Sequence, residues 1–480
     1  MLTVMNIPCP ITYSVKLQQM AEEMFRPPVN RAMRVLDRSF FQKKIPVSAA
    51  RVVDNKTISK CRSELFRSKD ALLLERYQIV RPDPTEPDAK AGKKCILLRP
   101  QVDDKGADYS WSKTVAELEK SNMINIVPYE INLDYDYWDY QDIASAVLPQ
   151  SEEHDEIPSG FTLVGHVAHL NLREQYMPYK NIIGEILVDK NPAVRTVINK
   201  IDDVGEESEY RTFKYEVLAG PDDMDVEIRE ADCTFKFNYA KVYWNSRLNT
   251  EHQRLVDAFE KGQAVCDVMA GIGPFAVPAG KKGVFVWAND LNPDSHESML
   301  DAISRNKVHK FVKPFNEDGH VFIKEAARKL LKTEHEVQIL AKQSRTEAKE
   351  TKAPPKVLRT VKQPKVFSHY VMNLPATAIE FLPAFSGLYT EEDRKLLPNA
   401  FKLPMIHVYC FDTKSDDNVQ EGISICKKIS EQIGFEVTPQ TPELSIFDVR
   451  DVAPKKRMFC ASFRLPEEVA FRPRQSLPTR

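Results

Sequence analysis

Helical and extended patterns alternate along the sequence from about residue 240 onward, and this alternation constrains the fold more than any other feature. Segments rich in β-branched and aromatic residues predict strands over 264–269, 284–289, 311–315, 370–373 and 406–411. Intervening segments predict helices over 250–261, 294–306 and 419–434. Residues 436–438 and 458–464 are expected to add an antiparallel edge pair. Strands that alternate with helices form parallel sheets, so we predict an α/β domain here.

The first half of the chain carries a mixed pattern instead. Residues 31–41 and 114–120 look helical, and residues 95–98 look like a short strand. Further strands are predicted over 161–166, 182–188, 215–219 and 231–239, which indicates a small α+β domain. A length of 480 residues fits two to four domains.

Composition excludes several classes of protein. With 42% hydrophobic and 28% charged residues, and no apolar run long enough to cross a bilayer, we expect a soluble globular protein without a membrane segment. Eight scattered cysteines without a C-x-x-C pair predict reduced thiols and no metal site. A net charge of −2 means that any surface for nucleic acid must be local. The basic residues within 26–44 fit either a mitochondrial address or a surface helix.

A basic segment interrupts the α/β domain at residues 328–365. It carries eleven Lys or Arg against four Glu, with few apolar residues. We expect its beginning to extend a helix and the remainder to be a mobile insertion. A solvated loop and a contact with RNA phosphates are both open for this remainder.

A glycine turn follows the first predicted strand of the α/β domain. Gly271 and Gly273 would let the backbone approach a ligand at the carboxyl end of that strand. The next strand ends at Asp290, 23 residues after Asp267, where a carboxylate can accept ribose hydroxyls. The pattern also satisfies a loose dinucleotide fingerprint, and Asp290 also suits a helix cap. A nicotinamide-dependent oxidoreductase is therefore an alternative at this point.

Two later strand ends extend the pattern. Asp318 and Gly319 follow the third strand, where a short acid often meets an adenine amine. The fourth strand ends in Asn373-Leu374-Pro375, which is similar to the Asn-Pro-Pro-aromatic turn of methyltransferases that act on planar nitrogens. Asn-x-Pro is also an ordinary strand-ending turn. Its position after three other strand-end features favours S-adenosylmethionine over a dinucleotide.

Four segments resemble the archaeal-eukaryotic tRNA (guanine-37 N1)-methyltransferases. They are VGHVAHLNL at 164–172, KVYWNSRL at 241–248, TEH at 250–252 and MNLP at 372–375. The resemblance spans about residues 120–465 in the family's order and is loose over the first hundred residues. It implies an N-terminal tRNA-recognition region (1–120), a middle α+β domain (121–240) and a class I, Rossmann-like methyltransferase domain (241–470) with the basic insertion.

The resemblance also implies roles for individual residues. Arg211 matches the arginine that holds the guanine oxygen, Glu251 matches the proton acceptor, and Asn373 matches the residue that contacts both base and methyl donor. The residues expected to hold the base are Tyr243, Arg247 and Pro375. The residues expected to bind S-adenosylmethionine are His252, Gly271, Gly273, Asp290, Leu291, Asp318, Gly319 and Asn373. His252 stands where archaeal relatives often have Arg.

The implied reaction needs these residue types. Guanine N1 becomes nucleophilic when its proton leaves, and the resulting charge on the neighbouring oxygen suits the guanidinium of Arg211. A general base such as Glu251 typically contributes about 10²–10⁴-fold. The flat clamp of Tyr243 and Pro375 suits a base that leaves its stack. From the residues alone, a structural role is favoured for Glu251, either as a first-turn helix acid or as a surface partner of Arg247, and a structural role is favoured for Arg211 as well. Only the family resemblance reverses this preference.

Three other readings compete with methyl transfer to guanine 37. A related wyosine-pathway enzyme transfers the aminocarboxypropyl group of the same cofactor, and the Arg211 and Glu251 matches argue against it. The nicotinamide-dependent oxidoreductase predicts no dependence on RNA, and a non-catalytic RNA-binding module predicts that loss of Glu251 is tolerated. We further expect a monomer that acts on tRNA with guanine at position 37. The family resemblance suggests pools in the cytoplasm, the nucleus and the mitochondrial matrix.

Overall fold

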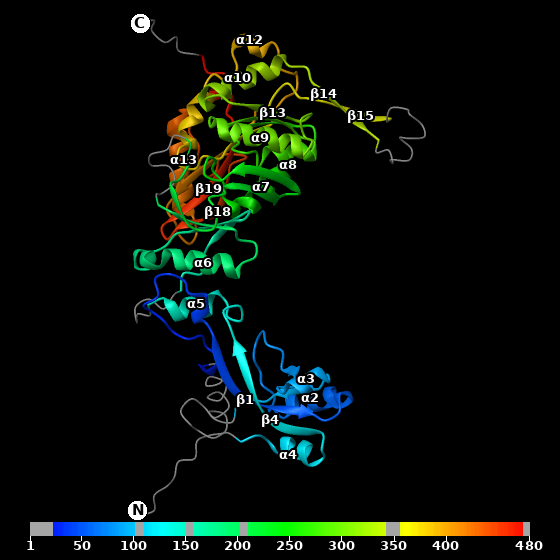
Figure 1. Cartoon of the computed structure of the whole chain (residues 1–480). Helices are drawn as coiled ribbons and strands as arrows, with labels where there is room; N and C mark the ends of the chain where they lie inside the picture. Colours follow the sequence, from blue (N-terminus) through cyan, green and yellow to red (C-terminus); the bar gives the residue numbers. More distant parts are fainter. Residues whose placement is uncertain are drawn as a thin grey trace, which may run out of the picture. The chain divides into compact units, whose positions relative to one another are not determined.

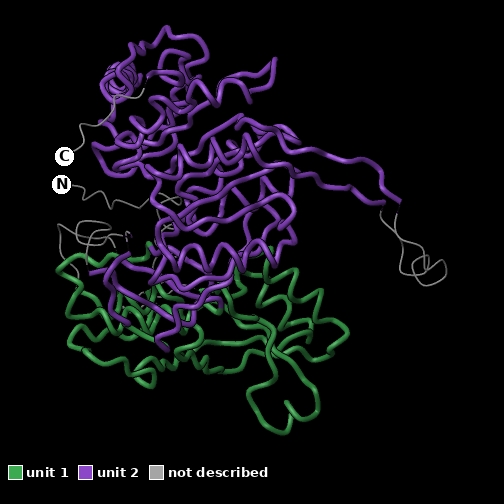
Figure 2. Tube along the Cα trace, turned by 90° about the horizontal axis from the view of Figure 1, so that it is seen from above, with its two compact units in different colours: residues 1–160, 171–192, 218–220 green, residues 161–170, 193–217, 221–480 purple. Residues whose placement is uncertain are grey.

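The structure is a computed structural model that describes residues 23–100, 110–149, 157–201, 210, 212–341 and 356–473. The chain forms two compact units (Figure 2). Unit 1 comprises residues 1–160, 171–192 and 218–220, and unit 2 comprises residues 161–170, 193–217 and 221–480. The expected division at 1–120, 121–240 and 241–470 is a different one and stays a prediction. Within the described ranges, no helix is long and apolar enough to span a membrane.

Unit 1 is built on an antiparallel sheet with the strand order β2-β3-β1-β4. Its strands are β1 (Lys43–Val52), β2 (Val80–Pro82), β3 (Lys94–Leu97) and β4 (Ile124–Leu133). Its helices include η2 (Asn55–Thr57), α2 (Ile58–Arg67), α3 (Glu86–Lys90), α4 (Lys113–Lys120), α5 (Tyr140–Val147) and η3 (Glu174–Tyr179). Leu65 of α2 and Leu118 of α4 are buried in one cluster with Ile96 of β3. The strand predicted at 95–98 and the helix predicted at 114–120 are confirmed.

Two segments of unit 1 differ from the prediction. Residues 182–188 lie in helix α6 (Lys180–Lys190) rather than in a strand. Most of this apolar run is buried, and such a run has no periodicity that separates a buried helix from a buried strand. Residues 31–41 form turns and the short helix η1 (Arg38–Phe40) rather than one long helix. There the Asp37 carboxylate accepts the backbone N–H of Ser39 at 3.0 Å, a local bond that competes with helical pairing.

Two smaller sheets of unit 2 precede its main sheet along the chain. One has the order β5 (Thr162–Val164), β6 (Val167–Leu170), β7 (Thr196–Lys200) and β8 (Tyr215–Ala219), and the end of β8 belongs to unit 1. The other pairs β9 (Asp225–Glu230) with β10 (Cys233–Asn238) in antiparallel fashion. The strands predicted near 161–166, 215–219 and 231–239 are confirmed.

A seven-stranded sheet with the order β13-β12-β11-β16-β17-β19-β18 forms the centre of unit 2 (Figure 1). The parallel strands are β11 (Ala264–Asp267), β12 (Phe285–Asn289), β13 (Val312–Phe315), β16 (His369–Met372) and β17 (Met405–Asp412). β19 (Lys456–Arg464) runs antiparallel to both β17 and the edge strand β18 (Ser445–Ala453). The strand order reverses between β11 and β16, which is where open α/β sheets bind ligands. The expected Rossmann-like class is confirmed.

Helices cover both faces of this sheet. They are η4 (Ser246–Leu248), α7 (Asn249–Ala258), α8 (Ala276–Lys282), α9 (Pro293–Arg305), α10 (Gly319–Lys332), η5 (Ala378–Phe385), α12 (Glu391–Arg394), α13 (Val419–Ile433) and α14 (Glu467–Ala470). Val265 of β11 packs in one cluster with Leu255 of α7. The next residue, Cys266, packs in the other cluster with Phe322 of α10. Consecutive strand residues thus serve opposite hydrophobic layers.

Two features of this domain were not predicted correctly. The prediction omits α8, because Pro278 and Gly280 lower the helix propensity of that segment. Residues 436–438 form no strand, and the Thr438 N–H donates to Thr441 Oγ1 at 2.9 Å in a turn instead. The outer member of the antiparallel pair is β18.

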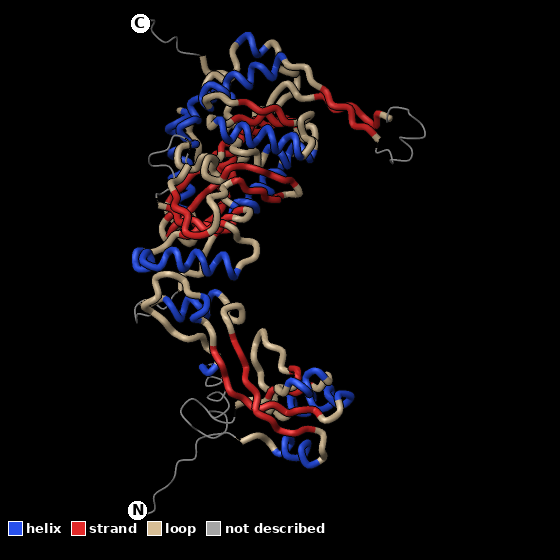
Figure 3. Tube along the Cα trace, viewed as in Figure 1, coloured by secondary structure: helices blue, strands red, loops and turns tan. Residues whose placement is uncertain are grey.

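The basic segment 328–365 contains more regular structure than predicted. α10 extends into it to Lys332, as expected, but the segment predicted to be mobile includes a hairpin of β14 (Glu336–Leu340) and β15 (Val357–Lys362). Residues 342–355 lie outside the described ranges. The hairpin projects from unit 2 as a two-stranded arm (Figure 3). Because β15 leads into the amino end of β16, the arm starts from the edge opposite the carboxyl ends of the parallel strands. Its contact with RNA stays a prediction.

A partly buried histidine, His369 of β16, and a buried one, His407 of β17, form a hydrogen-bonded chain between these strands. His369 Nδ1 lies 3.0 Å from His407 Nε2, and His369 Nε2 lies 3.1 Å from Gln263 Oε1. His407 Nδ1 lies 2.8 Å from Ser462 Oγ. Burial lowers the pKa of His369 to about 4 and lowers the pKa of His407 well below its ordinary value. Both rings are therefore neutral at pH 7.

We expect acid to destabilise the fold through these histidines. Their folded-state pKa lies below the unfolded value of about 6.5, so the stability that they confer is complete above that pH and falls as pH drops. For His369 the loss is about 1.4 kcal/mol per pH unit down to about pH 4. Denaturant unfolding between pH 7.5 and 5 should show a shallower acid slope for His369→Asn than for the wild type. The exposed-site control His309→Asn should keep the wild-type slope, and equal slopes in all three proteins would contradict this account.

Candidate active site

The turn after β11 is held by the carboxylate of Asp290, which directly follows β12. Asp290 Oδ2 accepts the backbone N–H of Gly271 at 2.7 Å, and Oδ1 accepts that of Asn292 at 3.0 Å. Burial raises the pKa of Asp290, and the two N–H donors oppose this shift. Gly271 and Gly273 have φ angles of 56° and 94°, in the left-handed region that favours glycine. The predicted glycines and the predicted acid therefore lie together.

Asp267, the last residue of β11, is a buried carboxylate that the sequence analysis did not assign to the site. It is 0% exposed, and neither of its oxygens has a hydrogen-bond partner among the described residues. Burial, and then the charge of Asp290, raise the pKa of Asp267 well above its ordinary value. A buried carboxylate without a partner is costly, so this position fits a donor from a bound cofactor. The signal in the sequence is an acid that ends an apolar strand just before the glycine turn.

The second and third strand ends are tied together by Asn316. Its Nδ2 donates to the backbone oxygens of Asp290 at 2.7 Å and Leu291 at 3.0 Å. The Leu291 side chain is 46% exposed beside this junction. Leu291 is thus an apolar side chain available at the carboxyl edge of the sheet.

Asp318 and Gly319 open helix α10 at the same edge. The Asp318 carboxylate caps the helix by accepting the N–H groups of His320 at 2.9 Å and Val321 at 3.3 Å. A Cβ at Gly319 would lie 3.0 Å from the ring of Phe381, so the close approach of η5 requires glycine. The structure gives Asp318 a capping role, and its contact with the cofactor stays a prediction.

The Asn373-Leu374-Pro375 turn follows β16 and is fixed from two sides. The Pro375 carbonyl accepts the N–H of Phe411 in β17 at 3.1 Å. The Leu374 carbonyl accepts the N–H of Ala378 at 2.7 Å, which starts η5. Asn373 is partly exposed at this turn. These residues lie on the other side of the strand-order reversal from the Gly271 turn.

The segment that carries Tyr243 is anchored to the cofactor edge through Asn292. Asn292 Nδ2 donates to the carbonyl oxygen of Lys241 at 2.9 Å, while the Asn292 N–H is held by Asp290. Tyr243 itself is 44% exposed, and Arg247 is also exposed. An exposed aromatic ring on an anchored backbone suits a surface on which a planar base stacks.

Glu251 is buried and paired, so its surface pairing with Arg247 is ruled out. It is 4% exposed in the first turn of α7, and Arg254 donates to both of its oxygens, at 2.6 and 2.7 Å. Tyr409 Oη donates to Oε1 at 2.6 Å. The guanidinium of Arg254 also lies 4.1 Å from the ring centre of Phe447 in β18. Tyr409 was not predicted, because only the fold brings β17 against α7. Arg254 was not predicted either, although it lies three residues after Glu251 on the same helix.

His252 is also buried, and Glu230 fixes its ring. His252 Nδ1 lies 2.6 Å from Glu230 Oε1, and the ring meets Phe275 edge-on with centres 4.8 Å apart. The pairing leaves Nε2 as the nitrogen available to a ligand. Phe275 follows the glycine turn directly, which places His252 behind that turn.

The carboxyl edge of the parallel sheet therefore gathers most of the predicted residues, from the glycine turn to the Asn373 turn. Arg211 lies outside the described residues. Every role in catalysis or binding that the resemblance implied stays a prediction.

We expect Asp290→Ala to weaken binding of S-adenosylmethionine by about 10- to 100-fold, because charge-assisted bonds of about 1.5–3 kcal/mol that shape the turn are lost. Isothermal titration calorimetry would measure the dissociation constant, with the melting temperature as a check on folding. Asp294→Ala is the matched control, because Asp294 is half-exposed at the start of α9 and pairs with Lys241 at 3.2 Å. An unchanged constant in Asp290→Ala would leave Asp290 with a capping role only.

Sequence comparisons agree with this arrangement. Residues 140–223 match the TYW2 N-terminal domain, and residues 226–350 match the TRM5/TYW2 methyltransferase domain. A protein of Aspergillus fumigatus named tRNA (guanine(37)-N(1))-methyltransferase is 54% identical over 94% of this chain and 96% of its own length. A protein of Schizosaccharomyces pombe with the same name is 43% identical over 92% of this chain and 95% of its own length.

Solved structures share the fold. Trm5b from Pyrococcus abyssi has a TM-score of 0.51 at 20% identity and covers 87% of this chain and 99% of its own. The complex of aTrm5 with tRNALeu has a TM-score of 0.55 at 17% identity and covers 87% of this chain and 100% of its own. On the identity to its fungal relatives over nearly the whole length, the chain belongs to the TRM5/TYW2 family of S-adenosylmethionine-dependent methyltransferases.

Proposed function

We propose that this protein transfers the methyl group of S-adenosylmethionine to N1 of guanine 37 in tRNA, beside the anticodon, which supports maintenance of the reading frame. The observation that carries the proposal is the 54% identity, over 94% of the chain, to a protein named for that reaction. The carboxyl edge of the main sheet supports it, because the glycine turn, the strand-end acid and the Asn373 turn lie there together.

The residues of this edge fit the cofactor. When bound, S-adenosylmethionine supplies a methyl group already activated on sulfur. Asp290 shapes the glycine turn, Asp267 offers acceptor atoms without a partner among the described residues, and Leu291 offers an exposed apolar surface. The protein's contribution is then to position the guanine and to remove its N1 proton.

Glu251 is the proposed proton acceptor. Its Oε1 accepts hydrogen bonds from Tyr409 and Arg254, whereas among the described residues Oε2 accepts only from Arg254 Nε. A carboxylate oxygen accepts two bonds readily, so Oε2 keeps a position for the proton of N1. The fork from Arg254 holds the carboxylate in one orientation, which suits a general base.

Other residues are proposed to bind the guanine base and to stabilise the negative charge that develops on it. We propose that Tyr243 and Pro375 stack on the two faces of the flipped guanine, with Asn373 and Arg247 contacting its edge and surroundings. Arg211 would stabilise the negative charge that reaches the guanine oxygen as N1 loses its proton. These assignments rest on the family resemblance, together with the exposure of Tyr243 and the fixed Pro375 turn.

The other readings are less well supported. The fungal relatives described above carry the name of a tRNA methyltransferase, which favours methyl transfer over a nicotinamide-dependent oxidoreductase and over a non-catalytic RNA-binding module. Transfer of the aminocarboxypropyl group remains the nearest alternative within the family, since the matched N-terminal domain carries the TYW2 name. The mass of the product separates the two transfers.

The first test is methyl transfer from labelled S-adenosylmethionine to unmodified tRNA transcripts with guanine or adenine at position 37. We expect N1-methylguanosine with the guanine transcript only, identified by mass analysis of the nucleosides. A heavier aminocarboxypropyl adduct, or no product despite tight binding of both cofactor and tRNA, would contradict the proposal.

The second test concerns Glu251. We expect Glu251→Gln to lower the single-turnover rate by about 10²–10⁴-fold while the cofactor dissociation constant is unchanged, because an amide accepts no proton at neutral pH. Glu260→Gln, at an exposed carboxylate after α7, is the control and should keep the wild-type rate. Loss of cofactor affinity with an unchanged rate per complex would remove Glu251 from the chemistry.

We also propose a monomer with no membrane attachment, distributed between the cytoplasm, the nucleus and the mitochondrial matrix. The family resemblance supports the distribution. The basic residues of 26–44 contribute to unit 1, since Arg38 pairs with Asp189 at 2.8 Å and Arg34 stacks on Tyr179. Light scattering tests the oligomeric state, and a dimer would contradict the proposed monomer. Subcellular fractionation tests the distribution, and a single compartment would contradict it.

A further inference from the structure

The edge strand β18 is irregular where it passes the Tyr243 segment. Its pairing with β19 shifts register between Asp448 and Arg450 and again between Asp451 and Ala453. Such bulges redirect side chains and are common beside active sites. The residues between the two shifts include Arg450, which the proposed reaction has not used.

Arg450 points toward the segment that carries the proposed base-stacking residue. Its Nη1 lies 3.5 Å from Asn245 Oδ1, and the same oxygen accepts the backbone N–H of Arg247 at 3.1 Å. Asn245 is two residues from Tyr243, so two guanidinium groups flank the start of α7 beside that exposed ring. Phe447, three residues before Arg450, stacks under Arg254, which fixes β18 against α7.

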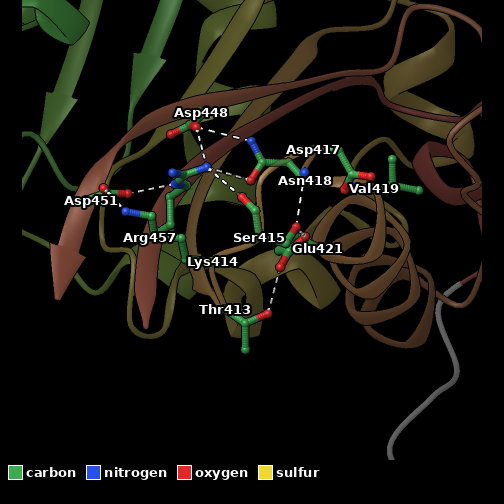
Figure 4. A network of polar contacts seen from close by, with 10 residues as sticks. All are labelled: Thr413, Lys414, Ser415, Asp417, Asn418, Val419, Glu421, Asp448, Asp451 and Arg457. Atoms are coloured by element: carbon green, nitrogen blue, oxygen red, sulfur yellow. Dashed lines mark hydrogen bonds and ion pairs between the residues drawn. The ribbon is translucent and has the colours of Figure 1, made fainter. Parts of the chain in front are cut away.

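The nearby carboxylates are engaged elsewhere. Arg457 pairs with Asp448 at 2.9 Å and with Asp451 at 2.8 Å, and Lys414 pairs with Asp451 as well (Figure 4). Asn418 Nδ2 donates at 3.2 Å to Asp448 Oδ2, the oxygen that also pairs with Arg457. Within the described part of the chain, neither Arg450 nor Arg247 forms an ion pair with a carboxylate.

This pairing pattern leaves local positive charge that is not neutralised. Burial, and then the charge of Arg247, lower the pKa of Arg450. The charged form of Arg450 is therefore destabilised by its surroundings. The hairpin turn after β18 adds Lys455, and β19 begins with Lys456; both residues are exposed. Since Arg457 pairs in register with Asp412 at the end of β17, this turn lies at the carboxyl edge of the parallel strands. An anion that reaches this edge would relieve the repulsion.

We propose that Arg450, together with Arg247, binds a backbone phosphate of the tRNA next to the nucleotide that stacks on Tyr243. Two guanidinium forks match the oxygens of a phosphate diester, which is the anion that an RNA brings to this edge. The inference rests on the proposed function and adds to it a contact that holds the target nucleotide in register. Arg450 is thus an RNA-binding residue outside the motifs identified in the sequence.

The first experiment measures tRNA binding by fluorescence anisotropy at salt concentrations from about 50 to 300 mM. Contacts with phosphates weaken strongly over about this range. Arg450→Ala should raise the dissociation constant about 5- to 20-fold and reduce the salt slope by about one, while cofactor affinity is unchanged. Arg450→Lys should keep the slope, because the charge remains. Arg305→Ala is the matched control, since Arg305 is exposed and already paired with Asp301 in the last turn of α9.

The second experiment locates the phosphate. A tRNA assembled with an uncharged methylphosphonate at either linkage flanking guanine 37 should bind wild-type protein more weakly than the natural tRNA. Arg450→Ala should lose less affinity on this modification than the wild type does, because only Arg247 remains to contact the phosphate. If Arg450→Ala kept the wild-type salt slope, or lost as much affinity to the methylphosphonate as the wild type does, the inference would be overturned. Both experiments measure tRNA binding and not methyl transfer. If Arg450→Ala changed the binding as expected but the protein formed no methylated product, the proposed function alone would be overturned.

Discussion

The hydrogen bonds of the partly buried Asp290 carboxylate are the interaction on which the site depends. They join the turn after β11, the end of β12 and the start of α9, which are otherwise separate in the chain. Removing a carboxylate from water is costly, and the two backbone N–H donors offset that cost. Asp267 lies buried nearby without such donors among the described residues, so the same edge retains acceptor atoms for a ligand. A firm turn and an acid without a partner among the described residues together support the proposed binding of the cofactor at this edge.

The residues proposed to act on RNA are organised from the opposite side of the strand-order reversal. Tyr409 of β17 contacts Glu251 of α7, and Phe447 of β18 contacts Arg254 of the same helix. Arg450 of β18 continues this contact toward the Tyr243 segment. The antiparallel pair at the end of the sheet is therefore part of the active site in this account. It positions the proposed general base and presents positive charge along the path of the RNA.

Most of the central sheet followed from local patterns in the sequence, because its strands are apolar, short and bounded by clear turns. The cofactor edge was predictable for the same reason, since Gly271, Asp290 and Asn373 each end a recognisable strand. Helix α6 was not, because the apolar run at 182–188 has no period that separates a buried helix from a strand. The β14–β15 arm was missed because its polar, basic composition resembles that of a mobile loop.

Contacts between segments that are distant in the chain could not be predicted from the sequence. The pairing of Glu251 with Arg254 is local and lies within reach of a helical spacing argument, but the choice of Arg254 over Arg247 depends on which side of α7 is buried. Tyr409 and Arg450 reach the site only because β17 and β18 lie beside α7 in the folded sheet. A sequence without its fold gives no signal for either residue.

In the proposed reaction the enzyme removes the N1 proton of a purine whose neighbouring oxygen takes up the negative charge. The most direct measurement compares single-turnover methylation of tRNA with guanine, inosine or adenine at position 37. Inosine keeps both N1–H and the adjacent oxygen, so the account predicts N1-methylation of guanine and inosine and none of adenine. Methylation of adenine, or of a guanine atom other than N1, would contradict it.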